Sequence, residues 1–373
     1  MQNKDKSITT REPLFRITKR SDLSNMQTAV FYAFAILLAI VIGGLFVLAI
    51  GVNPFKFFST VINGCFKSKL SVISLVRIIV PLLIISQGVA ISFKMRFWNI
   101  GAEGQFIMGA IGASAVALFV TGLPHWLMMI LMALAGIVTA GVWGLIPAFF
   151  KTKFNTNETL LTLMLNYIAL YIIQLLRDGP WKDPNGGGYP SIAKFPKVAW
   201  IDKLWGLDVS WIVAIVITIL AYVYLKYTKQ GYEISVVGDS RDTARYAGMN
   251  NSAIIMRTMF ISAAIIGIGG MLQVAGDSTT HTLDMGIANG VGFTAIIVAW
   301  LGQLNPIGIF IVSCLFGMLE KGCGVAQSQF NISSTVSDIL QGIILFVIIG
   351  SAFFIRYKLV FSSKHNKDSK EAK

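Results

Sequence analysis

The carboxylate of Glu103 is the acidic group set deepest in apolar sequence in this chain. It lies in the octet Trp-Asn-Ile-Gly-Ala-Glu-Gly-Gln at 98–105, between apolar stretches long enough to cross a membrane. A charge at the centre of a membrane helix costs about 2.5–3.5 kcal/mol, so it is expected to have a partner or a task. Two tasks compete: binding a coupling ion or solute, or favouring the start of a helix through the helix dipole.

Proton or ion coupling has little support beyond this one group. The other acidic residues lie in loops or at the ends of apolar stretches, whereas ion-coupled carriers use several ionisable groups near the middle of the membrane. Arg77 is the candidate counter-charge of Glu103; alternatively, its long side chain extends to the membrane surface.

Amide side chains within the apolar stretches complete a candidate substrate path. A membrane Asn or Gln more often bonds a neighbouring helix than a ligand, so each of them also has a structural interpretation. Together they suit a neutral, hydroxyl-bearing or heterocyclic solute better than a charged one. The candidate path residues are Gln87, Trp98, Asn99, Glu103, Gln105 and Asn166.

Signatures of an enzyme are absent from the sequence. It has no phosphate-binding G-x-x-x-x-G-K-[S/T] loop, and its three histidines have no metal-ligand spacing. The cysteines Cys65, Cys314 and Cys323 form neither a C-x-x-C pair nor an even disulfide framework. We therefore expect no catalytic residue, no metal site and no cofactor in this chain. Transport against a gradient would need an ion gradient or another polypeptide.

These groups must be positioned by membrane helices. The chain has 373 residues, 55% of them apolar and 13% charged, and its mean hydropathy is +0.69. This composition predicts an all-α polytopic membrane protein. About ten transmembrane helices are expected, near 30–52, 70–93, 100–120, 126–150, 159–176, 209–227, 254–275, 288–301, 306–320 and 339–355, of which 288–301 is the shortest.

The net charge of +13 indicates how the chain is oriented in the membrane rather than binding to nucleic acid. Most of the 31 Lys and Arg residues fall in segments that lie inside if both termini are cytoplasmic. The loop 178–208, rich in Pro, Gly and Trp, then lies outside. It either covers the bundle as a lid or docks an external partner, and the sequence does not decide between them.

The outer loop also divides the spans into five before it and five after it, which predicts two halves of inverted topology with a path between them. The Gly-rich segments 99–112 and 286–302 are the third spans of their halves. The predicted organisation is a basic N-terminal segment (1–29), a first half (30–177), the outer loop (178–208), a second half (209–356) with an inner loop (228–252), and a basic tail (357–373).

The inner loop contains a short, well-delimited helix, expected near 241–247. Ser240 is a suitable N-cap, Asp242 suits the first turn, and Gly248 can close the helix. A capped helix in a loop is typical of a rigid surface that a partner contacts.

Four segments resemble permease subunits of ATP-binding-cassette importers of the branched-chain amino acid, simple sugar and nucleoside family. They are Phe-Trp-Asn-Ile-Gly-Ala-Glu-Gly-Gln at 97–105, Asn-Glu-Thr-Leu-Leu-Thr-Leu-Met-Leu-Asn-Tyr-Ile-Ala at 157–169, Thr-Ala-Arg-Tyr-Ala-Gly-Met-Asn at 243–250 and Ala-Trp-Leu-Gly-Gln-Leu-Asn-Pro-Ile-Gly at 299–308. The outer Gly-Pro-Trp-Lys-Asp-Pro at 179–184 resembles the larger of two paired nucleoside permeases. The resemblance covers about 16–356.

The resemblance implies a paired permease core in a bacterial cytoplasmic membrane, cytoplasmic ATPases that bind ATP and Mg, and an external substrate-binding lipoprotein. The short inner helix would be the coupling helix, with Arg241, Asp242, Arg245, Tyr246 and Gly248 in it. Nucleosides are the expected solutes. Simple sugars or riboflavin-like compounds are the alternative, and a stand-alone ion-coupled carrier is the alternative of another class.

Overall fold

The structure is a computed structural model that describes residues 15–19, 25–184, 190–276, 281–333 and 335–361. It forms two compact units, one of residues 57–337 and one built from both ends of the chain, with boundaries inside helices α2 and α13. Each unit is described by itself. The predicted segments 1–29 and 357–373 and the outer loop lie partly outside the described residues.

The unit built from the chain ends contains two long helices and two strands. Strand β1 (Phe15–Lys19) pairs antiparallel with β4 (Tyr357–Phe361), and Phe15 lies opposite Phe361. Helix α1 (Asn25–Ala49) packs on α13 (Thr335–Arg356) through the small side chains of Ala35 and Ala39. The first and last predicted spans therefore form one helix pair.

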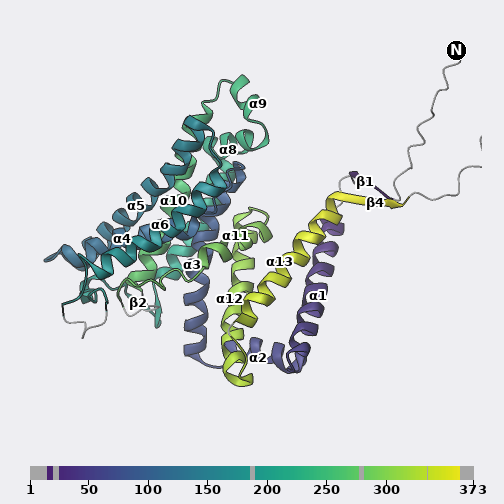
Figure 1. Ribbon diagram of the computed structural model, residues 1–373, viewed down its shortest axis with the longest axis horizontal. Helices are drawn as coiled ribbons and strands as arrows, with labels where there is room; N and C mark the ends of the chain where they lie inside the picture. Colours follow the sequence, from purple (N-terminus) through teal and green to yellow (C-terminus); the bar gives the residue numbers. More distant parts are fainter. Residues whose placement is uncertain (1–14, 20–24, 185–189, 277–280, 334, 362–373) are drawn as a thin grey trace, which may run out of the picture. The chain divides into compact units, whose positions relative to one another are not determined.

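The larger unit is helical, with one small hairpin (Figure 1). Its helices are α2 (Pro54–Phe66), α3 (Lys69–Lys94), α4 (Ala102–Phe119), α5 (His125–Phe154), α6 (Glu158–Asp178), α7 (Ser210–Tyr227), α8 (Lys229–Asp239), α9 (Arg241–Tyr246), α10 (Asn251–Ala275), α11 (Val291–Leu301) and α12 (Pro306–Phe330). The hairpin pairs β2 (Lys203–Leu204) with β3 (Leu207–Asp208). In Figure 1, α8 and α9 lie at one end of this unit and β2 lies toward the other.

Seven described helices are long and apolar enough to cross a membrane: α3, α4, α5, α6, α7, α10 and α12. The number is eight if the bent pair of α1 and α2 is counted as one span. The predicted class, an all-α polytopic membrane protein, is confirmed. Each of the ten predicted stretches overlaps one helix, but ten complete spans are not confirmed. In particular, α11 has 11 residues and rises about 16 Å, which is half of a hydrocarbon core.

Close glycine contacts build the centre of the larger unit. Gly109 of α4, Gly136 of α5 and Gly267 of α10 face one another so closely that a side chain on Gly267 would overlap the Gly136 carbonyl. Small residues let membrane helices approach with their backbones in contact. As a result, α4, α5 and α10 run together in Figure 1, and α3, α4 and α10 are the most buried spans.

Helix α2 has no counterpart among the predicted spans, because its 13 residues are too few to cross a membrane. The Asn53 side chain accepts a hydrogen bond from the Phe55 amide at its start, and Pro54 follows this cap. One face, with Phe57 and Val61, is buried against α12. The sequence signal that could have predicted α2 is a capping Asn followed by Pro and by apolar residues at helical spacing.

The described part of the outer loop is packed onto the helix ends. The His125 ring, at the start of α5, bonds the Val198 carbonyl at 2.8 Å and the Asp202 carboxylate at 3.1 Å. The Trp200 ring stacks on His281, which follows α10, with 4.0 Å between centroids. These contacts hold the described part of the loop against the helix ends, and the covering role stays a prediction. The docking role stays a prediction, and the predicted glycines 186–188 and Tyr189 lie outside the described residues.

Candidate solute path and coupling surface

The start of α4 is built by a pair of amide side chains. Asn99 donates to the Gln105 side-chain oxygen at 3.1 Å, and Gln105 donates back to the Asn99 oxygen at 3.2 Å. The Asn99 oxygen also accepts from the Gly101 amide. Both side chains are fully buried, so in this conformation they fold the segment between α3 and α4 back onto the first turns of α4.

Helix α6 holds the same segment from the side. The Asn166 oxygen accepts from the Gly104 amide at 2.8 Å, and its nitrogen donates to the Ile100 carbonyl at 2.9 Å. The Thr162 hydroxyl accepts from the Ile100 amide. An amide that satisfies one backbone donor and one backbone acceptor is expected where a helix start is buried.

Glu103 reaches across to a different helix. One carboxylate oxygen accepts from the Gly290 amide at 2.8 Å, and the other accepts from the Gly292 amide at 2.7 Å. Gly290 is the N-cap of α11, with φ +81°, and a side chain on Gly292 would overlap the backbone of Glu103. The carboxylate therefore occupies the positive end of the α11 dipole, where a negative charge is stabilised.

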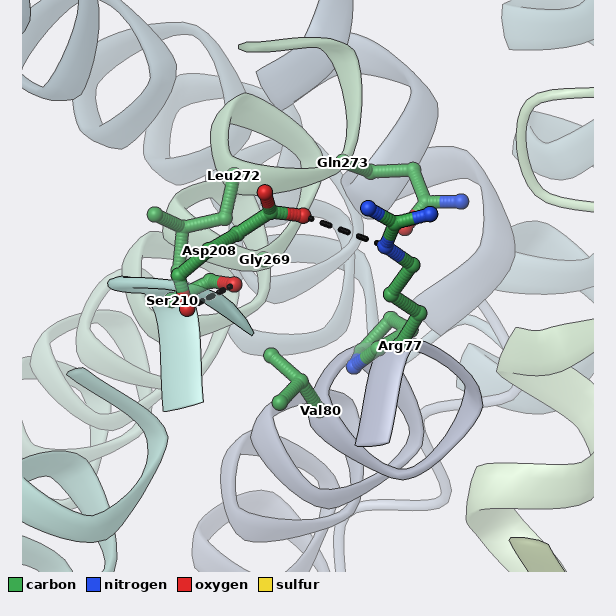
Figure 2. A pocket seen from close by; sticks show the side chains of 8 residues that line it. Arg77, Val80, Asp208, Ser210, Gly269, Leu272 and Gln273 are labelled. Carbon is green, nitrogen blue, oxygen red and sulfur yellow. Dashed lines mark hydrogen bonds and ion pairs between the residues drawn. The ribbon is translucent and has the colours of Figure 1, made fainter. Parts of the chain in front are cut away.

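Arg77 is not the counter-charge of Glu103, contrary to the sequence-based expectation. Its guanidinium instead pairs with Asp208 at 3.5 Å, at the end of the β2–β3 hairpin (Figure 2). Asp208 is buried, and the pair borders a cavity of about 10 Å³ together with Gln273, which is room for about one water molecule. This pair fastens the hairpin to α3.

The segment before α4 and the end of α11 meet through aromatic rings. The Trp98 and Trp300 indoles stack with centroids 5.5 Å apart and planes 24° apart, and Phe93 lies against both. Trp98 is 46% exposed and Trp300 is 41% exposed. The cluster is therefore accessible, unlike the neighbouring amides.

Gln87 stands apart from the other candidate path residues. Its side-chain nitrogen donates to the Pro306 carbonyl at 3.0 Å and to the Thr218 hydroxyl at 3.3 Å. It is fully buried and ties α3 to α7 and α12. The structure thus brings Asn99, Gln105 and Asn166 together at the start of α4, the helix that carries Glu103. Trp98 lies in the aromatic cluster with Trp300, and Gln87 lies at a separate helix crossing.

The helix predicted for the inner loop is present and is capped as expected. The Ser240 hydroxyl accepts from the Thr243 amide, α9 runs over Arg241–Tyr246, and Gly248 follows with φ +77°. The Asn251 side chain donates to the Arg241 carbonyl at 2.8 Å. Asp242, Arg245 and Tyr246 are exposed, and Tyr246 is 93% exposed.

The opposite face of α9 is anchored in the bundle. Ala244 is fully buried in a cluster to which α3, α5, α7, α8 and α10 each contribute an apolar residue. Glu233 of α8 and Arg257 of α10 form an ion pair at 2.7 Å. A push on the exposed face of α9 would therefore act directly on the ends of several spans.

Comparison with known proteins decides the family. The family model described as "Branched-chain amino acid transport system / permease component" matches residues 71–349. The chain belongs to this permease family. It is 31% identical to the guanosine ABC transporter permease protein NupP of Bacillus subtilis, over 87% of this chain and 93% of NupP.

Two further relatives of the permease differ in their solutes. The glucose ABC transporter permease protein TsgB13 of Haloferax volcanii is 28% identical, over 87% of this chain and 88% of that protein. The nucleoside ABC transporter permease protein NupB of Lactococcus lactis is 26% identical, over 84% and 88% of the two chains. These relatives are transport components, and their names cover both nucleosides and a sugar.

Three contributors to the permease site were not predicted individually. Gly290 and Gly292 lie in the Gly-rich third segment of the second half, and Trp300 lies in the motif at 299–308. The available signal was the matching place of the two Gly-rich segments in their halves. Among the residues that the structure describes, no group of three or more His, Cys, Asp or Glu side chains could hold a metal ion.

Proposed function

We propose that this permease imports nucleosides across a bacterial cytoplasmic membrane by alternating access, driven by separate ATPase subunits. One observation carries the choice of a neutral solute: Glu103 already occupies the start of the half-length helix α11. In transporters, the positive ends of such broken helices bind anionic groups of substrates. A carboxylate of the chain in that place disfavours a solute carboxylate, such as that of a branched-chain amino acid.

The accessible aromatic pair favours a nucleoside over a simple sugar. Trp98 and Trp300 offer flat, partly exposed apolar surface where the segment before α4 meets the end of α11. Aromatic rings stack on nucleobases, which have a π face that a plain sugar lacks. The similarity to NupP and NupB supports the same choice, whereas the similarity to TsgB13 keeps sugars as the alternative.

Coupling to ATP would pass through α9. The partner ATPases would bind ATP and Mg, and their closure would move the exposed Asp242, Arg245 and Tyr246. The buried anchor at Ala244 would transmit that motion to the spans. The proposed complex also contains a second permease, which forms a heterodimer with this chain, and an external lipoprotein that delivers the solute.

The solute is tested by uptake into proteoliposomes that hold the complete complex and its lipoprotein, with ATP inside. We expect labelled guanosine to accumulate and unlabelled nucleosides to compete with it. Glucose, riboflavin and leucine should not compete. Accumulation of glucose without guanosine would overturn the nucleoside assignment while leaving an ATP-driven importer.

Coupling is tested with Arg245→Glu in the same complex. This exposed charge reversal should abolish uptake and substrate-stimulated ATP hydrolysis, while the permease still inserts and assembles. Arg245→Lys, which keeps the positive charge, should retain a measurable part of both activities. Unchanged hydrolysis in the Glu variant would remove α9 from the coupling surface.

The alternative function is that of a stand-alone ion-coupled carrier. Co-purification distinguishes it from the proposed ATP-driven importer. Extraction of this chain in mild detergent should bring down an ATPase. Uptake by the isolated chain, driven by an ion gradient without ATP, would overturn the proposal.

A further inference from the structure

A basic cavity lies where the ends of α3, α7 and α8 meet the segment between α11 and α12. Its volume is about 460 Å³, and its lining includes Lys94, Lys226, Tyr232, Ser235 and Gln303. The proposed function gives this cavity no role, because the site around Glu103 is built by other residues.

The cavity carries positive charge with no compensating carboxylate in its lining. The two acidic residues of α8 are engaged elsewhere: Glu233 pairs with Arg257 at 2.7 Å, and Asp239 pairs with Arg96 at 3.9 Å. Among the described ion pairs, none joins Lys94 or Lys226 to a carboxylate. Both ammonium groups therefore remain available to an external anion.

The position of Lys226 is fixed by aromatic neighbours. Its ammonium group donates to the Tyr222 hydroxyl at 2.8 Å and lies 5.2 Å and 5.5 Å from the ring centroids of Tyr222 and Tyr227. Cation–π contacts of this kind orient a lysine without neutralising it. The charge is thus held at the cavity by uncharged groups.

The walls of the cavity are closely packed. A side chain on Gly231 of α8 would overlap the Tyr224 carbonyl, and one on Gly238 would overlap the Lys94 carbonyl. These two glycines hold α8 directly against the ends of α7 and α3. Pro306 also lines the cavity, and the hydrogen bond from Gln87 to its carbonyl fastens the start of α12.

An apolar surface runs from the cavity along α7. Ile219, Leu220 and Val223 are 56%, 59% and 42% exposed, about one to two helical turns before Lys226. Exposed apolar side chains on a membrane span face lipid chains or another span. A basic cavity that continues into an apolar face matches both parts of a phospholipid.

We propose that this cavity binds the phosphate-bearing headgroup of an anionic phospholipid from the leaflet on the side of α8 and α9. Lys94 and Lys226 would neutralise the phosphate, and the Tyr232 hydroxyl and the Gln303 amide would donate hydrogen bonds. The Ser235 hydroxyl already donates to the Gly231 carbonyl within α8. The acyl chains would lie along the exposed face of α7. Because α8 leads into α9, an occupied cavity would brace the coupling helix.

The test is lipid retention by the full-length permease in nanodiscs of phosphatidylglycerol and phosphatidylethanolamine, followed by delipidation in detergent and native mass spectrometry. The wild type should keep phosphatidylglycerol in preference to phosphatidylethanolamine. Lys94→Gln and Lys226→Gln should each weaken retention about fivefold, and the double variant about thirtyfold. Lys153→Gln, an exposed lysine on α5 outside the cavity, is the matched control and should behave as the wild type.

The double variant Lys94→Arg with Lys226→Arg should retain phosphatidylglycerol, which separates loss of charge from misfolding. Equal retention by the wild type and the double Gln variant would overturn the proposal. Displacement of the bound lipid by millimolar inorganic phosphate would identify a free-phosphate site instead and would also overturn it.

Discussion

The helices α4 and α11 take the third place in the two predicted halves of the chain, yet their starts are held in different ways. Helix α4 has 18 residues, and its start is fixed by Asn99, Gln105, Thr162 and Asn166, all from the first half. Helix α11 has 11 residues, and its start is fixed by Glu103, which belongs to α4. The start of α4 is supported by residues near it in the sequence, whereas the start of α11 depends on a helix far from it in the sequence.

This difference explains a carboxylate deep in apolar sequence without an ion-coupling role. Both Glu103 oxygens accept backbone hydrogen bonds at the positive end of a helix, which offsets the cost of the buried charge. Because Glu103 binds the start of α11, motion of α4 would carry the start of α11 with it.

The largest effect on stability is expected where α4 and α11 approach each other most closely. Gly292→Ala would place a methyl group against the Glu103 backbone. Neither backbone can yield, so we expect a loss of at least about 3 kcal/mol of stability, the upper end of usual overpacking costs. The measurement is thermal unfolding in detergent.

The matched control for that substitution is Gly324→Ala in α12. No atom lies within 4 Å of the added methyl group there, so its unfolding temperature should not fall. Equal losses for the two variants would contradict the close approach of α4 and α11.

The local support of α4 is tested with Asn166→Ala. This change leaves the Gly104 amide and the Ile100 carbonyl without their side-chain partner and should cost about 2 kcal/mol. Asn63→Ala, at an exposed Asn on α2, should change stability by less than about 0.5 kcal/mol. Thermal unfolding again measures both, and an unchanged Asn166 variant would place the support of α4 elsewhere.

The smallest effect is expected at the aromatic contact between the same two segments. A double-mutant cycle of Trp98→Leu and Trp300→Leu should give a coupling energy of about 0.5–1.5 kcal/mol, because both rings are partly exposed. A cycle that pairs Trp98→Leu with Trp205→Leu, at an exposed Trp of the outer hairpin, should give none. Zero coupling between Trp98 and Trp300 would contradict the stacked pair.

Much of the fold follows from local patterns in the sequence. Each predicted apolar stretch overlaps one helix, because the membrane requires a minimum length of apolar helix. The end of α12 was placed ten residues too early, at 320 instead of Phe330. Ser240 and Gly248 delimit α9 because caps act within one turn. Helix α2 was missed because its 13 residues are shorter than a span.

The site was less predictable, because its decisive contacts join distant segments. Glu103 suits a helix start by local rules, but the start it also holds lies 187 residues away at Gly290. Likewise, nothing local assigned Arg77 to Asp208 rather than to Glu103. Pairings between residues so far apart depend on how the spans pack, which hydropathy does not specify.

Hydrogen–deuterium exchange of Glu103→Gln tests the central claim most directly, namely that Glu103 holds the start of α11. Gln keeps the size but loses the charge and one acceptor, so exchange in peptides covering 286–301 should become about tenfold faster. Exchange in 241–247 should be unchanged, the permease should still assemble, and uptake should fall. Unchanged exchange at the start of α11 in a properly assembled Gln variant would contradict the account.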